Sequence, residues 1–344
     1  MSRTRCMLLL AVALLLVPST ARAAGDPVLG SQWGLESIRA EQAWVRTTGA
    51  GVRIGIVDTG VDMDHEELAG KVVADTTCVG SAGNPRACHG RGGDDDGHGT
   101  HVAGVAVAYK DNGKGGAGVA PDAELVVAKV FSSANVSSAK AATGEDIVAG
   151  IKWVVDHGAR VVNLSLGDPD MAFASSLPST NLRQGLDYAW THGAVPVLAA
   201  GRYERLGVNL ADPSSNDLHA IVVGATTSDG TMASYSAPTG AARLAVLAPG
   251  GAGTGDRQGD VYSSTWARGR HNAYAVRSGT SIAAAHVSGA VALLLAEGYN
   301  GPGAVERLLA TSDGTVSCGT ESPSCWGRID AVRATDGPVV PAHA

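Results

Sequence analysis

The chain reads Ser278-Gly-Thr-Ser281-Ile-Ala-Ala-Ala-His286-Val-Ser-Gly289 near its C-terminal end. Ser281 stands at the start of Thr280–Glu297, an apolar segment with the spacing of a buried helix. The positive end of such a helix and the backbone N–H of Ser281 would together stabilise an oxyanion beside the serine hydroxyl. The alternative is an ordinary N-cap serine that only closes the first helical turn.

Two stretches earlier in the chain carry an acid and a histidine, each in a glycine-rich context. The first is Ile54-Gly-Ile-Val-Asp58-Thr-Gly60, in which an apolar strand ends in an acid. The second is Gly97-His98-Gly-Thr-His101-Val-Ala-Gly104, in which a histidine opens an apolar helix. A turn acid, and a capping or core histidine, are the alternatives. Two histidines three residues apart, without a third ligand motif, are a poor zinc signal.

Short apolar runs alternate with segments of helical spacing along the chain. The predicted strands are Val52–Val57, Glu124–Phe131, Arg160–Leu166, Ala194–Ala199, Ala220–Gly224 and Arg243–Leu247. The predicted helices are His98–Tyr109, Gly144–Asp156, Leu182–His192 and Thr280–Glu297. This alternation predicts an α/β fold with a mainly parallel sheet that helices cover on both faces.

Acid, histidine and serine occur in the chain order of the subtilisin-like serine proteases, the subtilases, which this chain resembles. Further subtilase landmarks follow in the expected order: Gly118-Val-Ala-Pro121, Val162-Asn-Leu-Ser-Leu-Gly167 and Leu247-Ala-Pro-Gly250. The resemblance extends from about Asp26 to Val332. It implies the three-layer subtilisin-like fold and a secreted serine endopeptidase that works through an acyl-enzyme.

The resemblance also implies a role for each site residue. Ser281 would be the nucleophile, His98 the general base and acid, and Asp58 the group that orients the histidine. Ser165, Leu166 and Gly167 would pair with an extended polypeptide substrate through backbone hydrogen bonds, with a second strand near residues 132–136. The acids at positions 94–96 would either tune the pKa of His98 or form a solvated loop.

The oxyanion hole is where the chain departs most from the subtilase pattern. Subtilases follow a small-residue strand with Gly-Asn, and the asparagine donates to the oxyanion, but this chain has Gly201-Arg202. Three interpretations compete: Arg202 donates itself, Asn209 replaces the missing donor, or activity is reduced. The third leads to the alternative function, a catalytically weak or inactive subtilase-like protein that binds peptides or a partner. An esterase or lipase is disfavoured because Ser281 lacks a GxSxG context.

A calcium site is a further expectation from the resemblance, although the chemistry itself requires no cofactor. The loop at Asp111 and Asn112 resembles the calcium loop of the subtilases, and Asp26 and Glu67 stand where partner ligands would. Lys110 and Lys114 disfavour a cation there. A plain surface turn is the alternative interpretation.

The N-terminal residues have the layout of a cleavable signal peptide over residues 1–23. Arginines at positions 3 and 5 precede the apolar run Met7–Val17, and Ala21-Arg22-Ala23 provides a small-residue cleavage pattern. We therefore expect secretion to an extracellular or periplasmic location, a peptidase domain over residues 24–335 and a flexible tail over 336–344. No propeptide is evident after the signal, and no stable membrane anchor is expected.

Composition narrows the possible partners and the cysteine chemistry. The formal net charge of the whole chain is −7, which disfavours nucleic-acid binding, and we expect a monomer. Four cysteines follow the signal peptide and fall into two local pairs, so disulfides Cys78–Cys88 and Cys318–Cys325 are the simplest pairing. Two other pairings, or a zinc site without any CxxC, remain as alternatives.

Overall fold

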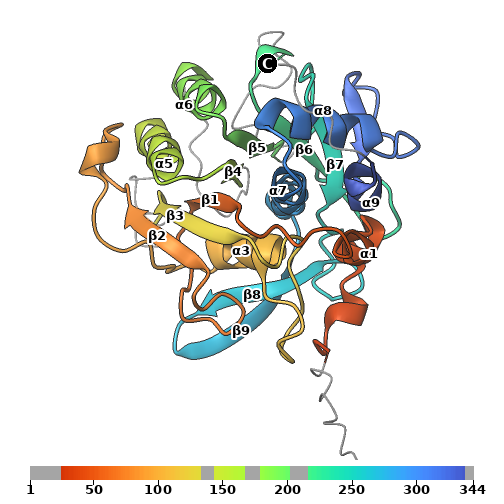
Figure 1. The fold of residues 1–344 in the computed structure, drawn as a ribbon, viewed down its shortest axis with the longest axis horizontal. Coiled ribbons are helices and arrows are strands. Elements are labelled where there is room, and N and C mark those ends of the chain that lie inside the picture. Colours follow the sequence, from red (N-terminus) through yellow and green to blue (C-terminus); the bar gives the residue numbers. More distant parts are fainter. Residues whose placement is uncertain (1–24, 133–142, 167–178, 202–215, 338–344) are drawn as a thin grey trace, which may run out of the picture.

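The fold is built on an eight-stranded sheet whose strands pair in parallel throughout (Figure 1). The structure, a computed structural model, describes residues 25–132, 143–166, 179–201 and 216–337. The strand order is β10-β7-β6-β5-β4-β1-β3-β2. The strands are β1 (Arg53–Asp58), β2 (Val72–Thr77), β3 (Glu124–Lys129), β4 (Val161–Leu164), β5 (Val195–Ala199), β6 (Ile221–Thr226), β7 (Ala245–Pro249) and β10 (Cys325–Arg328).

All six predicted strands are present, and the parallel α/β prediction is confirmed. The two sheet strands that the sequence did not predict, β2 and β10, are the two edges of the sheet. β2 is only partly buried, and β10 exposes Trp326. An edge strand contacts fewer neighbours than a central one, so it lacks the continuous apolar run that marks a buried parallel strand.

Helices lie on both sides of the sheet, as predicted (Figure 1). The described helices are α1 (Trp33–Ser37), α2 (Ala40–Ala43), α3 (His98–Val107), α5 (Gly144–Asp156), α6 (Ser179–Thr191), α7 (Thr280–Ala296), α8 (Gly301–Thr311), α9 (Ala331–Thr335) and the short 3-10 turns η1 (Leu29–Ser31) and η2 (Pro85–Ala87). The sequence predicted α3, α5, α6 and α7 and did not predict α1, α2, α8 and α9.

Side chains from the two faces of the sheet pack into two separate hydrophobic cores. Ile54 and Ile56 of β1 belong to the core that contains α3 and α7, whereas Val57 belongs to the core under α5 and α6. Gly55 faces α5 at close range, since a Cβ there would lie 2.8 Å from Val154 Cγ2. The result is a three-layer arrangement in which the sheet separates the two cores.

Helix α7 runs through the interior of the molecule beside the sheet (Figure 1). Every residue from Thr280 to Leu295 is buried. Small residues make this position possible: a Cβ on Gly289 would stand 2.5 Å from Cβ of Val119. Among the described residues no single helix is long and apolar enough to span a membrane, and only the sharply bent pair α7 and α8 passes such a test together.

A two-stranded antiparallel hairpin precedes α7 and packs on α3, outside the main sheet (Figure 1). Its strands are β8 (Val261–Ala267) and β9 (Arg270–Arg277). The sequence did not predict these strands, because β9 is largely half-exposed and carries no apolar run. The hairpin delivers the chain directly to the start of α7.

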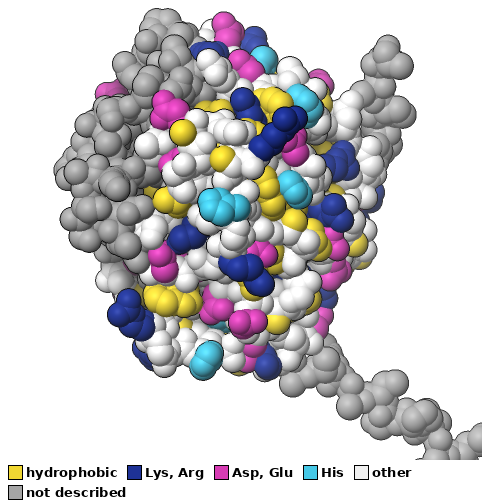
Figure 2. All heavy atoms as spheres, turned by 90° about the vertical axis from the view of Figure 1, so that its left-hand side faces the viewer, with side chains coloured by type: hydrophobic (Ala, Val, Ile, Leu, Met, Phe, Trp, Pro, Cys, Tyr) yellow, Lys and Arg dark blue, Asp and Glu magenta, His cyan; other side chains and the backbone are white. Residues whose placement is uncertain are grey.

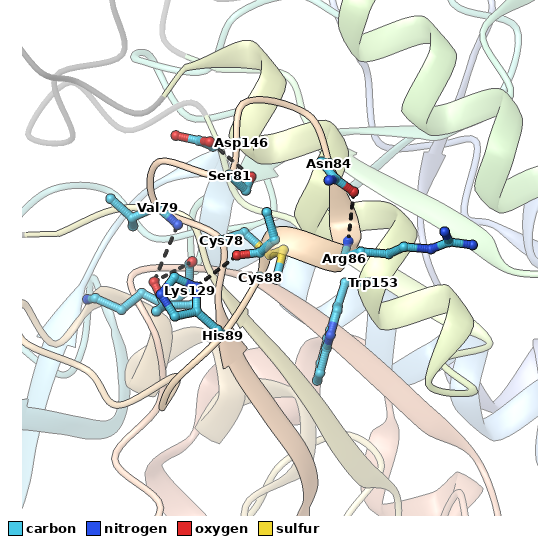
Figure 3. The surroundings of a disulfide bond; sticks show 12 residues. Cys78, Val79, Ser81, Asn84, Arg86, Cys88, His89, Lys129, Asp146 and Trp153 are labelled. Atoms are coloured by element: carbon cyan, nitrogen blue, oxygen red, sulfur yellow. Dashed lines mark hydrogen bonds between the residues drawn. A yellow bond between two sulfur atoms is a disulfide. The ribbon is translucent and has the colours of Figure 1, made fainter.

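Both predicted disulfides, Cys78–Cys88 and Cys318–Cys325, are present. The first closes the loop after β2, and Figure 3 shows Asp146 of α5 reaching this loop at Ser81. The carboxylate of Asp146 accepts from Ser81 Oγ and from the backbone N–H groups of Gly80 and Ala82. Acidic and basic side chains are interspersed on the face of the molecule at this end of the sheet (Figure 2).

Candidate active site

Asp58 and His98 meet at the carboxyl edge of the sheet. Asp58 is the last residue of β1 and His98 is the first residue of α3. Nδ1 of His98 lies 2.8 Å from Oδ1 of Asp58, and both side chains are buried. The backbone N–H of Thr59 donates to the same carboxylate oxygen over 2.7 Å, which orients the acid toward the histidine. Such a carboxylate holds the imidazole in the Nδ1–H tautomer, so that Nε2 is the basic nitrogen.

Asp94 fastens the start of α3 to the loop after β1. Oδ1 of Asp94 accepts from Thr59 Oγ1 and from the N–H groups of Asp96 and Gly97, whereas Oδ2 accepts from the N–H and hydroxyl of Thr100. Burial raises the pKa of Asp94, and these donors oppose the rise. The acidic run is therefore not a solvated loop at this residue, because Asp94 is buried as a capping group.

Lys129 is a buried cation that the sequence analysis did not single out. It ends β3 directly beside Asp58, since the two residues pair in the sheet register. Its Nζ donates to the carbonyl of Thr59 over 2.6 Å and to Oδ1 of Asp95 over 2.7 Å. Ser132 donates to the other oxygen of Asp95, so one network links the loop before His98 with the end of β3. From the sequence alone, a lysine at the end of a strand is expected to be exposed. Its place in this buried network is visible only in the folded structure.

Ser281 lies in the first turn of α7, next to the end of β4. Its Oγ donates to the carbonyl of Ser165 over 3.4 Å, and Oγ of Ser165 donates to the carbonyl of Ser281 over 2.8 Å. The predicted nucleophile thus lies against the segment predicted to bind substrate. Helix α7 also packs against α3, the helix that starts with His98.

A buried polar chain extends from this contact into the core. Asn163 donates from Nδ2 to Ser165 Oγ over 2.8 Å and accepts at Oδ1 from Ser288 Oγ over 2.8 Å. Asn163, Ser165 and Ser288 are fully buried. Because every member has a partner, the chain defines the position of α7 along β4. Asn163 belongs to a family landmark in the sequence, but its link to α7 is visible only in the fold.

The chain approaches Ser281 a second time at the end of β5. The N–H of Gly201 donates to Oγ1 of Thr280, the residue before Ser281, over 3.0 Å. Leu166, which belongs to the segment predicted to bind substrate, is buried. Three predicted site residues lie outside the described part of the chain: Gly167, Arg202 and Asn209.

The four residues predicted to bind calcium come together, but their oxygens already accept hydrogen bonds. The carboxylate of Asp26 accepts from the N–H groups of Asp111, Asn112 and Gly113 over 2.7–3.0 Å. Glu67 accepts from the amide of Asn112 over 2.9 Å and from the hydroxyl of Tyr274 over 3.0 Å.

Further contacts in this loop also disfavour a calcium ion. Asp111 pairs with Lys110, and Lys114 pairs with Glu66. Burial raises the pKa of Glu67, and the hydrogen bonds from Asn112 and Tyr274 oppose the rise. No group of three or more His, Cys, Asp or Glu in the described part of the chain is arranged to hold a metal. The donor set therefore does not fit calcium in this arrangement.

His101 and His286, the other histidines of the two motifs, are buried structural residues. Nε2 of His101 lies 3.3 Å from the carbonyl of Ala275 in the hairpin, and burial holds its pKa well below the usual value. Nδ1 of His286 lies 3.0 Å from the carbonyl of Ile282, and burial lowers its pKa to about 4. His101 therefore supports the hairpin, and His286 belongs to the core.

Comparisons with known proteins agree with this geometry. The sequence profile of the Subtilase family matches residues 49–313. The chain is 34% identical to thermitase of Thermoactinomyces vulgaris over 90% of this chain and 98% of that protein. It is 37% identical to subtilisin DY of Bacillus licheniformis over 77% of this chain and 84% of that protein. A protease structure from Pseudoalteromonas arctica superposes with a TM-score of 0.73 at 25% identity, covering 91% of this chain and 98% of that one.

Proposed function

This chain belongs to the subtilase family, and we propose that it is a secreted serine endopeptidase with Asp58, His98 and Ser281 as its catalytic triad. The observation that carries the proposal is the 2.8 Å contact between Asp58 and His98 at the sheet edge where α7 presents Ser281. A relative named a thermophilic serine proteinase, from Bacillus sp. (strain AK1), supports peptide-bond hydrolysis as the reaction; the chain is 33% identical to it over 67% of that protein.

The proposed mechanism uses the three side chains in sequence. His98 Nε2 takes the proton of the Ser281 hydroxyl as Oγ attacks the scissile carbonyl carbon. The tetrahedral intermediate collapses, the C–N bond breaks, and His98 gives the proton to the leaving amine. Water then attacks the acyl-enzyme by the same route and releases the acid. Asp58 remains ionised and stabilises the imidazolium throughout.

The oxyanion would receive hydrogen bonds from two sides. One donor is the backbone N–H of Ser281, at the positive end of the 17-residue helix α7. We expect the other donor from the residue that follows Gly201, because the N–H of Gly201 donates to Thr280, the neighbour of Ser281. Arg202 is the next residue, and its guanidinium is a stronger donor than an asparagine amide, although it is bulkier.

We expect an extended polypeptide substrate bound along the segment after β4. Ser165 and Leu166 supply backbone groups beside Ser281, and Ser132 begins the segment expected to lie on the other side. Secretion is supported by two disulfides, which persist in oxidising compartments, and by the signal-like residues 1–23. No step of the chemistry calls for a cofactor.

Labelling with a fluorophosphonate probe, together with a casein-cleavage assay, tests the proposal. The purified protein should label and cleave casein, whereas the Ser281→Ala variant should do neither. Absence of both signals in the unmodified protein would instead support a peptide-binding protein without catalysis. The variant Arg202→Asn should raise turnover if the oxyanion donor limits the rate, and an unchanged rate would remove that explanation.

A further inference from the structure

Arg277 ends the β8–β9 hairpin four positions before Ser281. It pairs with Val261 at the base of the hairpin, so its backbone position is defined by the two-stranded ladder. The hairpin in turn is attached to α3: Thr265 Oγ1 donates to the carbonyl of Gly97 over 3.1 Å, and Ser264 Oγ donates to that of Thr100 over 3.3 Å. Arg277 is therefore placed by the same elements that place His98.

The guanidinium of Arg277 lies over the start of α3. A Cβ placed on Gly97 would stand 3.3 Å from Nη2 of Arg277, and Gly97 directly precedes His98. The charge of Arg277 also reaches His101, one turn further along the helix. There burial is the largest cause of the lowered pKa, Arg277 is the second and His98 the third. Both observations place this cation at the first turn of α3, the helix that begins with His98.

Arg277 makes no ion pair or side-chain hydrogen bond with any residue in the described part of the chain. Other half-exposed arginines do, for example Arg39 with Asp330 and Arg46 with Glu297. Arg277 is only half-exposed, so water solvates its charge incompletely. Such a guanidinium is a ready partner for a carboxylate that arrives with a ligand.

The proposed mechanism tells which part of a substrate would meet this guanidinium. His98 gives its proton to the leaving amine, so the residues after the scissile bond must lie on the His98 side of the site. The residues before that bond are expected along the segment at Ser165, whose carbonyl accepts a hydrogen bond from Ser281. Arg277, beside Gly97, flanks the leaving-group side.

We propose that Arg277 is a specificity-determining residue that favours substrates with Asp or Glu in the first two positions after the scissile bond. The inference rests on the proposed function and adds a preference that the triad does not supply. A guanidinium binds a carboxylate with two parallel N–H···O hydrogen bonds, which an amide of the same shape does not reproduce. At a half-exposed site such a pair is worth about 1 kcal/mol, which corresponds to roughly 5- to 10-fold in kcat/KM.

Quenched fluorescent peptides that differ only at those two positions test the inference. The set compares Asp with Asn and Lys at those positions. A p-nitroanilide with the same residues before the scissile bond has no amino acid after it, so its hydrolysis reports activity without any contribution from those positions. The protein should prefer Asp to Asn by about 5- to 10-fold, mainly through KM, and added salt should reduce that ratio. The Asp-to-Asn ratio of kcat/KM should approach one in Arg277→Gln. In Arg277→Glu the peptide with Lys should become the preferred substrate.

Arg270→Gln is the matched control, because it removes an exposed cation at the far tip of the same hairpin and should keep the preference. The Asp-to-Asn ratio does not change when a variant merely folds less completely. A structural defect also does not reverse the preference from an acidic to a basic residue. Hydrolysis of the p-nitroanilide with equal rates for Asp and Asn would overturn the inference and leave the proposed function intact. No hydrolysis of any substrate, together with no fluorophosphonate labelling, would overturn both.

Discussion

Thr59 Oγ1 donates a hydrogen bond to Oδ1 of Asp94 over 2.9 Å, and accepts one from the N–H of Gly99 over the same distance. Thr59 follows Asp58, whereas Gly99 follows His98. One threonine hydroxyl therefore joins the loop that carries the acid to the helix that carries the histidine. The 2.8 Å distance between Asp58 and His98 depends on this junction as much as on the two side chains themselves.

Replacing Thr59 with valine should lower kcat/KM by about 10-fold, because the acid and the histidine lose a shared anchor worth about 1–2 kcal/mol. The fall should lie mainly in kcat, since Thr59 binds no substrate in the proposed mechanism. Thr59→Ser, which retains the hydroxyl, is the matched control. Equal rates for the two variants would mean that the hydroxyl does not position the site.

Ser288→Ala should destabilise the fold by about 1–3 kcal/mol and reduce kcat, because it leaves Oδ1 of buried Asn163 without its described donor. The effect should reach Ser281 through Ser165, which contacts both Asn163 and Ser281. Denaturant unfolding and steady-state kinetics measure the two quantities. A loss of stability with unchanged kcat would show that the polar chain supports the core alone.

Removing calcium should leave the melting temperature unchanged, because the oxygens of Asp26 and Glu67 are already occupied by protein donors. Thermal unfolding with EDTA and with added calcium gives the comparison. Tyr274→Phe should destabilise by about 1–2 kcal/mol under both conditions, since the buried carboxylate of Glu67 loses a hydroxyl donor. A clear rise of the melting temperature with calcium would show instead that the loop rearranges to bind the ion.

Stability should fall as the pH falls from about 6.5 toward 4, because His286 has its pKa lowered to about 4 by burial while the unfolded chain keeps the ordinary value of 6.5. Between these values the unfolded state binds more protons, so acid favours unfolding. The full contribution is about 3 kcal/mol and is absent at neutral pH, where both states are uncharged.

The variant His286→Gln isolates this contribution, since glutamine stays neutral over the whole pH range. Its unfolding free energy should depend less on pH between about 6.5 and 4 than that of the unmodified protein. Chemical unfolding at several pH values makes the comparison. Parallel pH profiles for the two proteins would assign the acid sensitivity to other groups.

The positions of the central strands along the chain were largely predictable. Central strands such as Ile54–Val57 are buried on both faces and are therefore recognisable in the sequence as apolar runs. The edge strands and the hairpin before α7 do not, because their exposed faces carry polar residues. The missed elements matter for function, since the hairpin brings Arg277 to the start of α3.

The sequence by itself determined the fold class, the family and the three residues expected to carry the reaction, because each lies in a local motif with a recognisable context. Only the tertiary structure decided how Asp94 connects Thr59 to α3, how Asn163 connects β4 to α7, and that Arg277 lies against Gly97 at the start of α3. These relationships join residues far apart in the chain, and a side chain's type does not reveal whether it will be buried or what it will face. The parallel sheet determines both the burial and the neighbours of these side chains, because it brings the ends of separate strands to one edge.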